Sequence, residues 1–131
     1  MGSRCAANRE RIVGDEVTSI CFEYGIVLRT LSKFEIRLST TVLLEPTDRS
    51  NATIDPEVIS PESLVILSAL HQKVVRCTVR EIGTMSMEFD GGFALHVPPN
   101  SDYEAWTVAG PGGYKVICAP GGEVVTWPTV G

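Results

Sequence analysis

Apolar and polar residues alternate with a period of two through much of the chain. In the first such run, Ile20, Phe22 and Tyr24 alternate with Cys21 and Glu23. Successive side chains of a strand point to opposite faces, so this period predicts half-buried β-strands. The first part of the chain is thereby predicted to form a meander of about four strands. Its later apolar positions and its turns are Ile26, Leu28, Phe34, Ile36, Leu38 and 41–45, with turns near Gly25, 31–33 and 39–40.

The alternation stops at Pro46, and a polar stretch without periodicity extends to Ser60. The end of this stretch carries the signals of a helix start. The Ser60 side chain can accept a hydrogen bond from the first turn, Pro61 suits the first helical position, and Glu62 complements the positive end of the helix dipole. We predict one helix over residues 61–70. Its expected apolar face consists of Leu64, Ile66, Leu67 and Leu70.

Strand patterns return after the helix, first at residues 75–79 and then on both sides of the run Asp90-Gly91-Gly92. Cross-strand partners share a face of the sheet. A three-residue loop sets Phe89 opposite Phe93 and Met87 opposite Leu95, which keeps the large apolar residues together. A two-residue loop would mix the two faces. We therefore predict a hairpin with the three-residue loop 90–92.

The last part of the chain contains three further strand candidates, at residues 104–109, 114–119 and 123–127. Glycine-rich joints separate them, and such joints supply the positive φ angles of tight hairpins. The predicted fold class is therefore mainly β (α+β), with about nine or ten short strands and one helix near residues 61–70. A sheet that large in so short a chain should fold over on itself as an antiparallel sandwich or an open barrel.

Length and composition indicate one domain. A chain of 131 residues can bury one core, and 44% apolar with 21% charged residues is typical of globular proteins. Residues 1–11 are polar and non-periodic. We expect them to form a flexible N-terminal tail, with a single β-rich domain at residues 12–131.

The charge balance bears on the kind of partner. The chain has 11 basic and 16 acidic residues and a net charge of −5, which argues against nucleic acid and favours a basic surface on a partner protein. No apolar run approaches the ~20 residues that a membrane-spanning helix needs, and residues 1–11 lack a signal core. We expect an acidic, cytoplasmic protein that does not bind membranes.

Metal and cofactor motifs are not recognisable. The four cysteines are too widely spaced for a paired zinc or redox motif, and in the cytoplasm they should stay reduced. The glycine clusters lead into no predicted helix, as a phosphate-binding loop would. We therefore expect neither a cofactor nor a metal.

One polar cluster is a candidate for catalytic chemistry. In the predicted hairpin register, His96 lies beside Ser86 with Glu88 on the diagonal, so an acid, an imidazole and a hydroxyl share one sheet face. An exposed cross-strand polar cluster has the same pattern, however, and no glycine loop that could form an oxyanion hole follows Ser86. The sequence favours a protein that is not an enzyme.

The segment from Pro98 to Trp106 is the first candidate for a partner surface. It joins a stiff Pro-Pro turn to Asp102, Tyr103, Glu104 and Trp106. Tyrosine and tryptophan are enriched at binding hot spots. Packing of these two aromatic residues in the core is the alternative. The acidic stretch 46–62 is the second candidate surface.

The C-terminal part also resembles a known family. The run YEAW at 103–106, the glycine turn at 110–113, the run PGGE at 120–123 and the final Trp127 are similar to the signature of an uncharacterised bacterial family of short proteins. The resemblance is close over roughly the last third of the chain, and the first half agrees in its strand pattern. It implies a stand-alone domain of unknown function and carries over no catalytic or binding residue.

Three kinds of function fit these features. The favoured one is a non-catalytic protein-interaction module, of which an immunity or antitoxin-type binding protein is an example. The alternatives are a small-ligand-binding or regulatory β-domain and, least favoured, an enzyme. The pattern leaves the oligomeric state open and is compatible with a homodimer.

Overall fold

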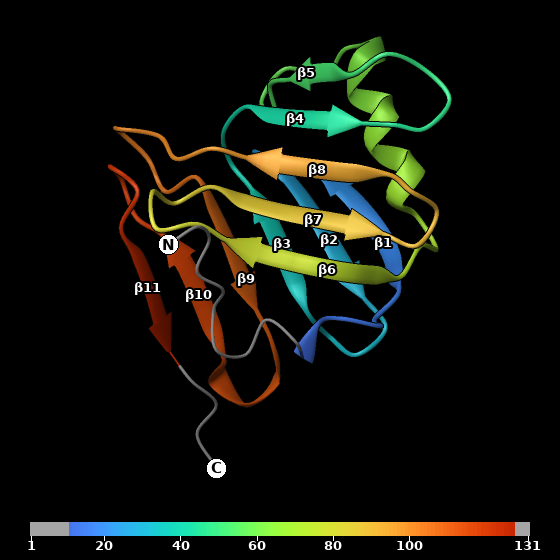
Figure 1. Cartoon of the computed structure of the whole chain (residues 1–131). Helices are drawn as coiled ribbons and strands as arrows, with labels where there is room; N and C mark the ends of the chain where they lie inside the picture. Colours follow the sequence, from blue (N-terminus) through green and yellow to red (C-terminus); the bar gives the residue numbers. More distant parts are fainter. Residues whose placement is uncertain (1–10, 128–131) are drawn as a thin grey trace.

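The computed structural model describes residues 11–127, which form two antiparallel β-sheets and two 3-10 helical segments (Figure 1). The six-stranded sheet contains, in spatial order, β1 (Val17–Phe22), β2 (Ile26–Thr30), β3 (Glu35–Leu38), β9 (Trp106–Ala109), β10 (Lys115–Cys118) and β11 (Val124–Trp127). The five-stranded sheet contains β5 (Ala52–Ile54), β4 (Val42–Glu45), β8 (Ala94–Val97), β7 (Met85–Phe89) and β6 (Val74–Val79). The helical segments are η2 (Pro61–Ala69) and η3 (Pro111–Gly113).

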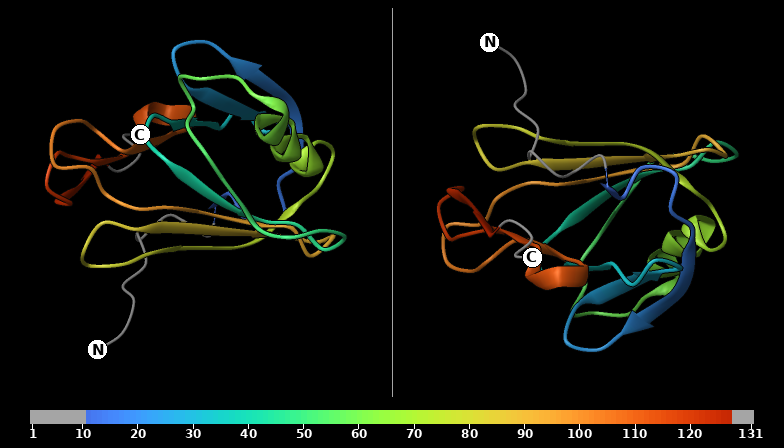
Figure 2. Two further views of the ribbon diagram at one scale, coloured as in Figure 1. Left: turned by 90° about the horizontal axis from the view of Figure 1, so that it is seen from above. Right: turned by 90° about the horizontal axis from the view of Figure 1, so that it is seen from below.

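The two sheets lie one over the other, and a single cluster of buried apolar side chains fills the space between them (Figure 2). Along β7, for example, Met85, Met87 and Phe89 are buried while the residues between them are not. The predicted mainly β sandwich is confirmed, and the sheets do not close into a barrel. The structure has eleven strands because residues 52–54, inside the polar stretch, pair with β4 as β5.

The prediction of one four-stranded meander was wrong for its last strand. β1, β2 and β3 do form a meander, but β3 pairs on its other side with β9, so that Ile36 lies opposite Val108. β4 crosses to the second sheet and pairs there with β5 and β8. The period of two shows which face of a strand is buried, but it does not show which distant strand will be its neighbour.

The β7–β8 hairpin has the predicted register. Met87 lies opposite Leu95. The N–H of Phe89 donates to the carbonyl oxygen of Phe93 at 2.9 Å, and the two rings pack with their centroids 5.7 Å apart. The large apolar residues of both strands therefore point into the core together, as the three-residue loop requires.

The helix begins where it was predicted, but η2 is a 3-10 helix. Such a helix has three residues per turn, so the residues of one face recur every third position. Its buried residues are Ser63, Ile66 and Ala69. The predicted apolar face, based on the α-helical period of 3.6, was therefore correct for Ile66, which is buried, and wrong for Leu64 and Leu67, which are exposed.

η2 covers the open side of the sandwich between the edge strands β1 and β5 (Figures 1 and 2). The chain that leaves the helix is fixed to the start of β1 by two backbone hydrogen bonds. The N–H of His71 donates to the carbonyl of Val17 at 2.8 Å, and the N–H of Val17 donates to the carbonyl of Gln72 at 3.0 Å. The helix is thus held at both sheets and closes the core on this side.

Trp106, which was predicted as part of a partner surface, is a core residue. Its side chain is 1% exposed, and its Nε1–H donates to the carbonyl oxygen of Gly83 at 2.8 Å. Trp106 begins β9 in one sheet, whereas Gly83 lies in the turn between β6 and β7 of the other. A buried indole needs a partner for its N–H, and here that hydrogen bond joins the two sheets.

The predicted N-terminal tail of residues 1–11 lies outside the described residues except for Arg11. The guanidinium group of Arg11 lies over the rings of Phe34 and Tyr114, at 5.8 and 5.3 Å from their centroids. Ile12 is buried in the core. Arg11, which the sequence assigned to the tail, is therefore packed against the β-rich domain.

The hydrogen bond from Trp106 predicts a stability difference. Trp106→Phe removes the donor to Gly83 and leaves space in the core, so we expect a loss of about 2–4 kcal/mol in the free energy of unfolding. The matched control is Trp127→Phe, at a half-exposed edge position, which should cost less than about 1 kcal/mol. Urea unfolding followed by circular dichroism measures both. Equal losses would show that the buried indole does not join the sheets as described.

A second prediction concerns two neighbouring glycines with positive φ angles. Gly121 has φ +90° and open space around it, whereas a side chain at Gly122, with φ +103°, would overlap the carbonyl oxygen of Ile82. Gly121→Ala should cost about 1 kcal/mol for the backbone conformation alone, and Gly122→Ala should cost about 3 kcal/mol or more. Thermal unfolding of the two variants gives the difference, and similar melting temperatures would contradict this packing of the two turns.

Candidate functional site

Five large apolar side chains are exposed in the β1–β2 turn and in residues 58–67, which lead into η2 and form most of it. Tyr24 is 99% exposed, and the other four members are between 44% and 65% exposed. We call this set the apolar surface, and it consists of Tyr24, Val58, Ile59, Leu64 and Leu67. Single exposed apolar residues are common, but a group of large ones marks an interaction site in soluble proteins.

Tyr24 and Ile59 line one hollow together, although they are distant in the sequence. The hollow has a volume of about 370 Å³, and its other lining residues are Phe22, Pro56 and Glu57. Tyr24 sits in the β1–β2 turn with φ +49°, in the left-handed region that a tyrosine seldom adopts. The turn thus directs a large aromatic ring into solvent beside a shallow apolar depression.

Local hydrogen bonds hold the segment that leads into η2. The N–H of Val58 donates to the carbonyl of Asp55 at 3.1 Å, and the hydroxyl of Ser63 donates to the carbonyl of Val58 at 3.3 Å. The N–H of Ser60 donates to Ser63 Oγ at 3.0 Å. The predicted cap at Ser60 thus uses its backbone N–H, and Val58 and Ile59 are presented by a structured turn.

The three-residue period of η2 explains why Leu64 and Leu67 are exposed. Ser63, Ile66 and Ala69 face the core. Leu64 directly follows Ser63, and Leu67 directly follows Ile66, so both leucines face outward. Both leucines are therefore exposed on the outer side of η2, which follows the turn that carries Val58 and Ile59.

The charge along the segment that carries four of the five members is one-sided. Residues 50–72 contain no Lys or Arg, and their carboxylates are those of Asp55, Glu57 and Glu62. All three residues are exposed. The apolar surface therefore has an acidic rim.

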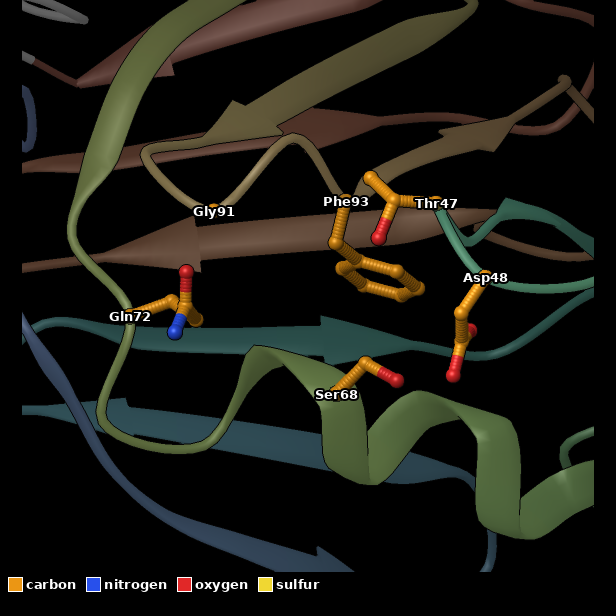
Figure 3. Close-up of a pocket in the computed structure, with 6 residues that line it drawn as sticks. All are labelled: Thr47, Asp48, Ser68, Gln72, Gly91 and Phe93. Carbon is orange, nitrogen blue, oxygen red and sulfur yellow. The ribbon is translucent and has the colours of Figure 1, made fainter.

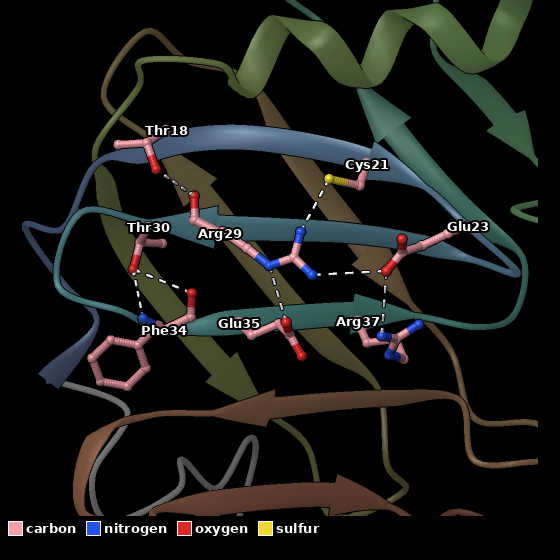
Figure 4. Close-up of polar contacts among 8 residues, drawn as sticks. All are labelled: Thr18, Cys21, Glu23, Arg29, Thr30, Phe34, Glu35 and Arg37. Atoms are coloured by element: carbon pink, nitrogen blue, oxygen red, sulfur yellow. Dashed lines mark hydrogen bonds and ion pairs between the residues drawn. The ribbon is translucent and has the colours of Figure 1, made fainter.

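Glu23, next to Tyr24, belongs to a different network on the outer face of the six-stranded sheet (Figure 4). Its carboxylate lies 3.7 Å from Arg29 and 3.9 Å from Arg37. Arg29 also donates to Cys21 Sγ at 3.0 Å and to Glu35 Oε2 at 3.1 Å. Desolvation lowers the pKa of Arg29, but its contacts with Cys21 and Glu35 outweigh this, and the pKa is raised. The charge of Glu23 is thus balanced locally, and the acidic rim rests on residues 55–62.

The predicted partner segment is divided between surface and core. Asp102, Tyr103 and Glu104 are exposed, whereas Trp106 is buried. The N–H groups of Asp102 and Tyr103 both donate to Asn100 Oδ1, at 2.7 and 3.1 Å, which shapes the turn. Figure 1 places this loop, between β8 and β9, on the left of the molecule and η2 on the right. It is therefore separate from the apolar surface.

The predicted polar cluster forms with a different carboxylate. Ser86 and His96 are cross-strand partners, with Ser86 Oγ 2.7 Å from His96 Nδ1. His96 Nε2 lies 3.1 Å from Glu45 Oε1 but makes no hydrogen bond within the described part of the chain. Glu88 lies opposite Ala94, which is the predicted diagonal position relative to His96, but the carboxylate recorded beside the ring is that of Glu45. The unpredicted pairing of β4 with β8 brings Glu45 to the ring instead.

This cluster has the nucleophile and base of a hydrolytic site but lacks a visible oxyanion site at Ser86. β7 pairs with β6 on one side and β8 on the other, so the backbone N–H groups next to Ser86 belong to the hydrogen-bond ladder. An oxyanion hole needs free donors beside the nucleophile. The geometry fits a cross-strand polar network on the outer sheet face.

The cysteines and acidic groups form no metal cluster in the part of the chain that the structure describes. Cys21, Cys77 and Cys118 lie in β1, β6 and β10, as strand residues, and none is in a disulfide. Burial raises the pKa of the Cys118 thiol, which keeps it protonated and unreactive. Between residues 11 and 127, no helix is long and apolar enough to span a membrane.

From the sequence, the 46–62 stretch was only the second candidate surface, Tyr24 was expected in a strand, and Leu64 and Leu67 were expected to face the core. Three features of the sequence could have indicated this surface. They are a tyrosine before a turn glycine, the adjacent pair Val58-Ile59 in a polar stretch, and the lack of basic residues from 50 to 72.

Comparisons with known proteins give one match. Neither the curated proteins nor the solved structures contain a chain that matches this one. A family model described as "Family of unknown function (DUF6188)" matches residues 9–128, which includes every strand of both sheets. The chain belongs to the DUF6188 family of unknown function.

Proposed function

We propose that this chain is a non-catalytic protein-interaction module that binds a basic, apolar segment of a partner protein on the apolar surface. The observation that carries the proposal is the combination of five exposed apolar side chains with an acidic rim free of Lys and Arg from residue 50 to 72. Apolar contacts would supply affinity, and the carboxylates would select the partner by charge.

The apolar surface costs free energy when no partner covers it. A non-glycine residue in the left-handed region costs about 1 kcal/mol or more, and the exposed ring of Tyr24 recovers none of this by packing. Apolar area removed from water contributes roughly 25 cal/mol per Å². A partner that covers Tyr24 and Ile59 would therefore gain this free energy from residues whose backbone is already held by local turns, which lowers the entropic cost of binding.

The rim favours a partner of opposite charge over a second copy of the chain. Two copies that met through this surface would bring Asp55, Glu57 and Glu62 of each copy close together, and like charges at an interface are unfavourable. A segment with Lys or Arg beside its apolar residues would meet the rim favourably. The net charge of −5 would add long-range attraction for such a segment.

The biological setting that we propose is an immunity or antitoxin-type role in the cytoplasm. Such proteins are small acidic binding modules whose effect comes from covering a partner. Neither catalysis nor a cofactor is needed for this role, and the chemistry of the apolar surface is sufficient for it.

A peptide-binding measurement tests the proposal. The probe is a fluorescent peptide with leucine and phenylalanine on one side and lysine on the other, and its control has glutamate in place of lysine. We expect the lysine peptide to bind, and Ile59→Ser combined with Leu64→Ser to weaken binding at least about tenfold because two apolar contacts are lost. Fluorescence anisotropy gives the dissociation constants.

Ile82→Ser is the matched control for these substitutions. Ile82 is 66% exposed, but it lies in the β6–β7 turn beside Gly122, outside the apolar surface. Its substitution should leave binding unchanged. Equal weakening by Ile82→Ser, equal binding of the glutamate peptide, or no binding of the lysine peptide would each overturn the proposal.

The acidic rim predicts a dependence on salt. Glu57→Gln combined with Glu62→Gln should weaken binding of the lysine peptide about threefold to tenfold at low salt and flatten the salt dependence, because surface charges are screened by ions. The melting temperature should hardly change, since both side chains are exposed. Glu104→Gln, on the other side of the molecule, is the control, and an equal effect from it would show that only net charge matters.

A further inference from the structure

β11 forms one edge of the six-stranded sheet. It pairs with β10 on one side, and within residues 11–127 no strand pairs with its other side. The edge of a sheet presents a row of backbone N–H and C=O groups, which is a template for pairing with a further strand. β11 can therefore accept one more strand.

The direction of these backbone groups follows from the β10–β11 hairpin. The N–H of Ala119 donates to the carbonyl oxygen of Glu123 at 2.7 Å, so these two residues form a hydrogen-bonded pair. Such pairs alternate with non-bonded pairs along an antiparallel ladder. The backbone of Val125 therefore bonds to β10, whereas the N–H and C=O groups of Val124 and Thr126 point to the open edge.

Two of the other three sheet edges lie beside η2. β1 and β5 flank the open side of the sandwich, and η2 occupies this side (Figure 1). Figure 3 shows the end of the helix beside the five-stranded layer, where Ser68 of η2 lines one hollow with Thr47 and Gly91. A helix that covers an edge hinders the addition of a further strand.

The third edge, β6, is protected in other ways. Its register shifts between Val74 and Arg76, and the N–H of Gly14 donates to the carbonyl oxygen of Val74 at 2.6 Å. Bulges, charged side chains and covering segments are the usual means by which proteins prevent pairing between edges. β11 differs from β6, because its four residues pair with β10 in a continuous register and include neither a charged residue nor a proline.

The outer face of β11 carries apolar side chains with opposite charges at its two ends. Val125 and Trp127 share this face with their cross-strand partners Ile117 and Lys115, and Trp127 is 49% exposed. Glu123 precedes Val125 by two positions and so lies on the same face. Lys115 and Glu123 are exposed, and neither has an ion-pair partner among residues 11–127.

We propose that β11 pairs with β11 of a second copy of this chain, antiparallel and around a two-fold axis at Val125. Val124 of each copy then lies opposite Thr126 of the other, and their outward N–H and C=O groups form about four hydrogen bonds. The two Val125 side chains meet at the axis as a cross-strand pair. The two six-stranded sheets thereby become one continuous sheet.

The charges favour a second copy over an unrelated strand. In this register Glu123 of one copy lies opposite Trp127 of the other, with Lys115 on the far side of that indole. The carboxylate and the ammonium group approach each other across the ring, which itself attracts the cation. Symmetry repeats this arrangement, so each end of the paired strands joins unlike charges.

One short strand on each copy gives a contact below the roughly 1,200 Å² of stable interfaces, so the association is weak and depends on concentration. Figure 1 places β11 on the left of the molecule and η2 on the right, so pairing leaves the apolar surface of each copy uncovered. The dimer does not rest on the proposed function. It would present two apolar surfaces at once, which strengthens the binding of any partner that spans both.

Sedimentation equilibrium of the full chain, from roughly 10 μM to 1 mM, tests the pairing. We expect the average mass to rise with concentration from that of one chain toward that of two. Thr126→Pro removes an outward N–H without breaking a bond to β10, so this variant should fold and remain monomeric. Thr126→Val keeps the N–H group, and this matched control should dimerise like the wild type.

Two charge reversals test the register without relying on the proline variant to fold, because both side chains are exposed. Glu123→Lys and Lys115→Glu should each weaken the association about threefold to tenfold, although they change the net charge in opposite directions. An equal mixture of the two variants should restore it, because each copy then meets unlike charges.

Three results would overturn the proposal. They are the mass of a single chain at every concentration, dimerisation of folded Thr126→Pro like the wild type, and a mixture of the charge variants that associates no better than either variant alone.

Discussion

The burial of Ile66 between the two sheets is the constraint on which the functional interpretation depends. A sandwich with edge strands β1 and β5 on one side needs a cover there, and η2 provides it with Ser63, Ile66 and Ala69. The three-residue period that puts these residues inward also puts Leu64 and Leu67 outward. The exposed leucines are therefore a consequence of how the core is closed.

The remaining structure depends on contacts between distant segments. β3 pairs with β9, β4 pairs with β8, and Trp106 joins the two sheets through Gly83. Each contact brings together residues more than 20 positions apart. The same long-range pairing creates the polar network of Ser86, His96 and Glu45, which explains why its carboxylate could not be identified from the hairpin alone.

The sequence predicted local features well and distant ones poorly. The strands other than β5, the β7–β8 register and the start of the helix follow from periodicity, loop length and capping residues, which are all local. The sheet that β4 joins and the burial of Trp106 depend on packing between the two sheets. The exposed side of η2 was missed because an apolar row such as Leu64-Leu67-Leu70 fits the inner face of an α-helix, whereas a 3-10 helix selects a different row. The acidic rim, in contrast, can be predicted from the sequence of residues 50–72 alone.

The central claim is that the apolar surface recognises a basic, apolar protein segment. Selection of a displayed random peptide library against the purified chain tests it most directly, because no partner needs to be assumed. The account predicts that enriched peptides combine Leu, Ile, Phe or Trp with Lys or Arg and lose binding to the variant with Ile59→Ser and Leu64→Ser. Enriched peptides that are acidic, or that bind this variant as well as the wild type, would contradict it.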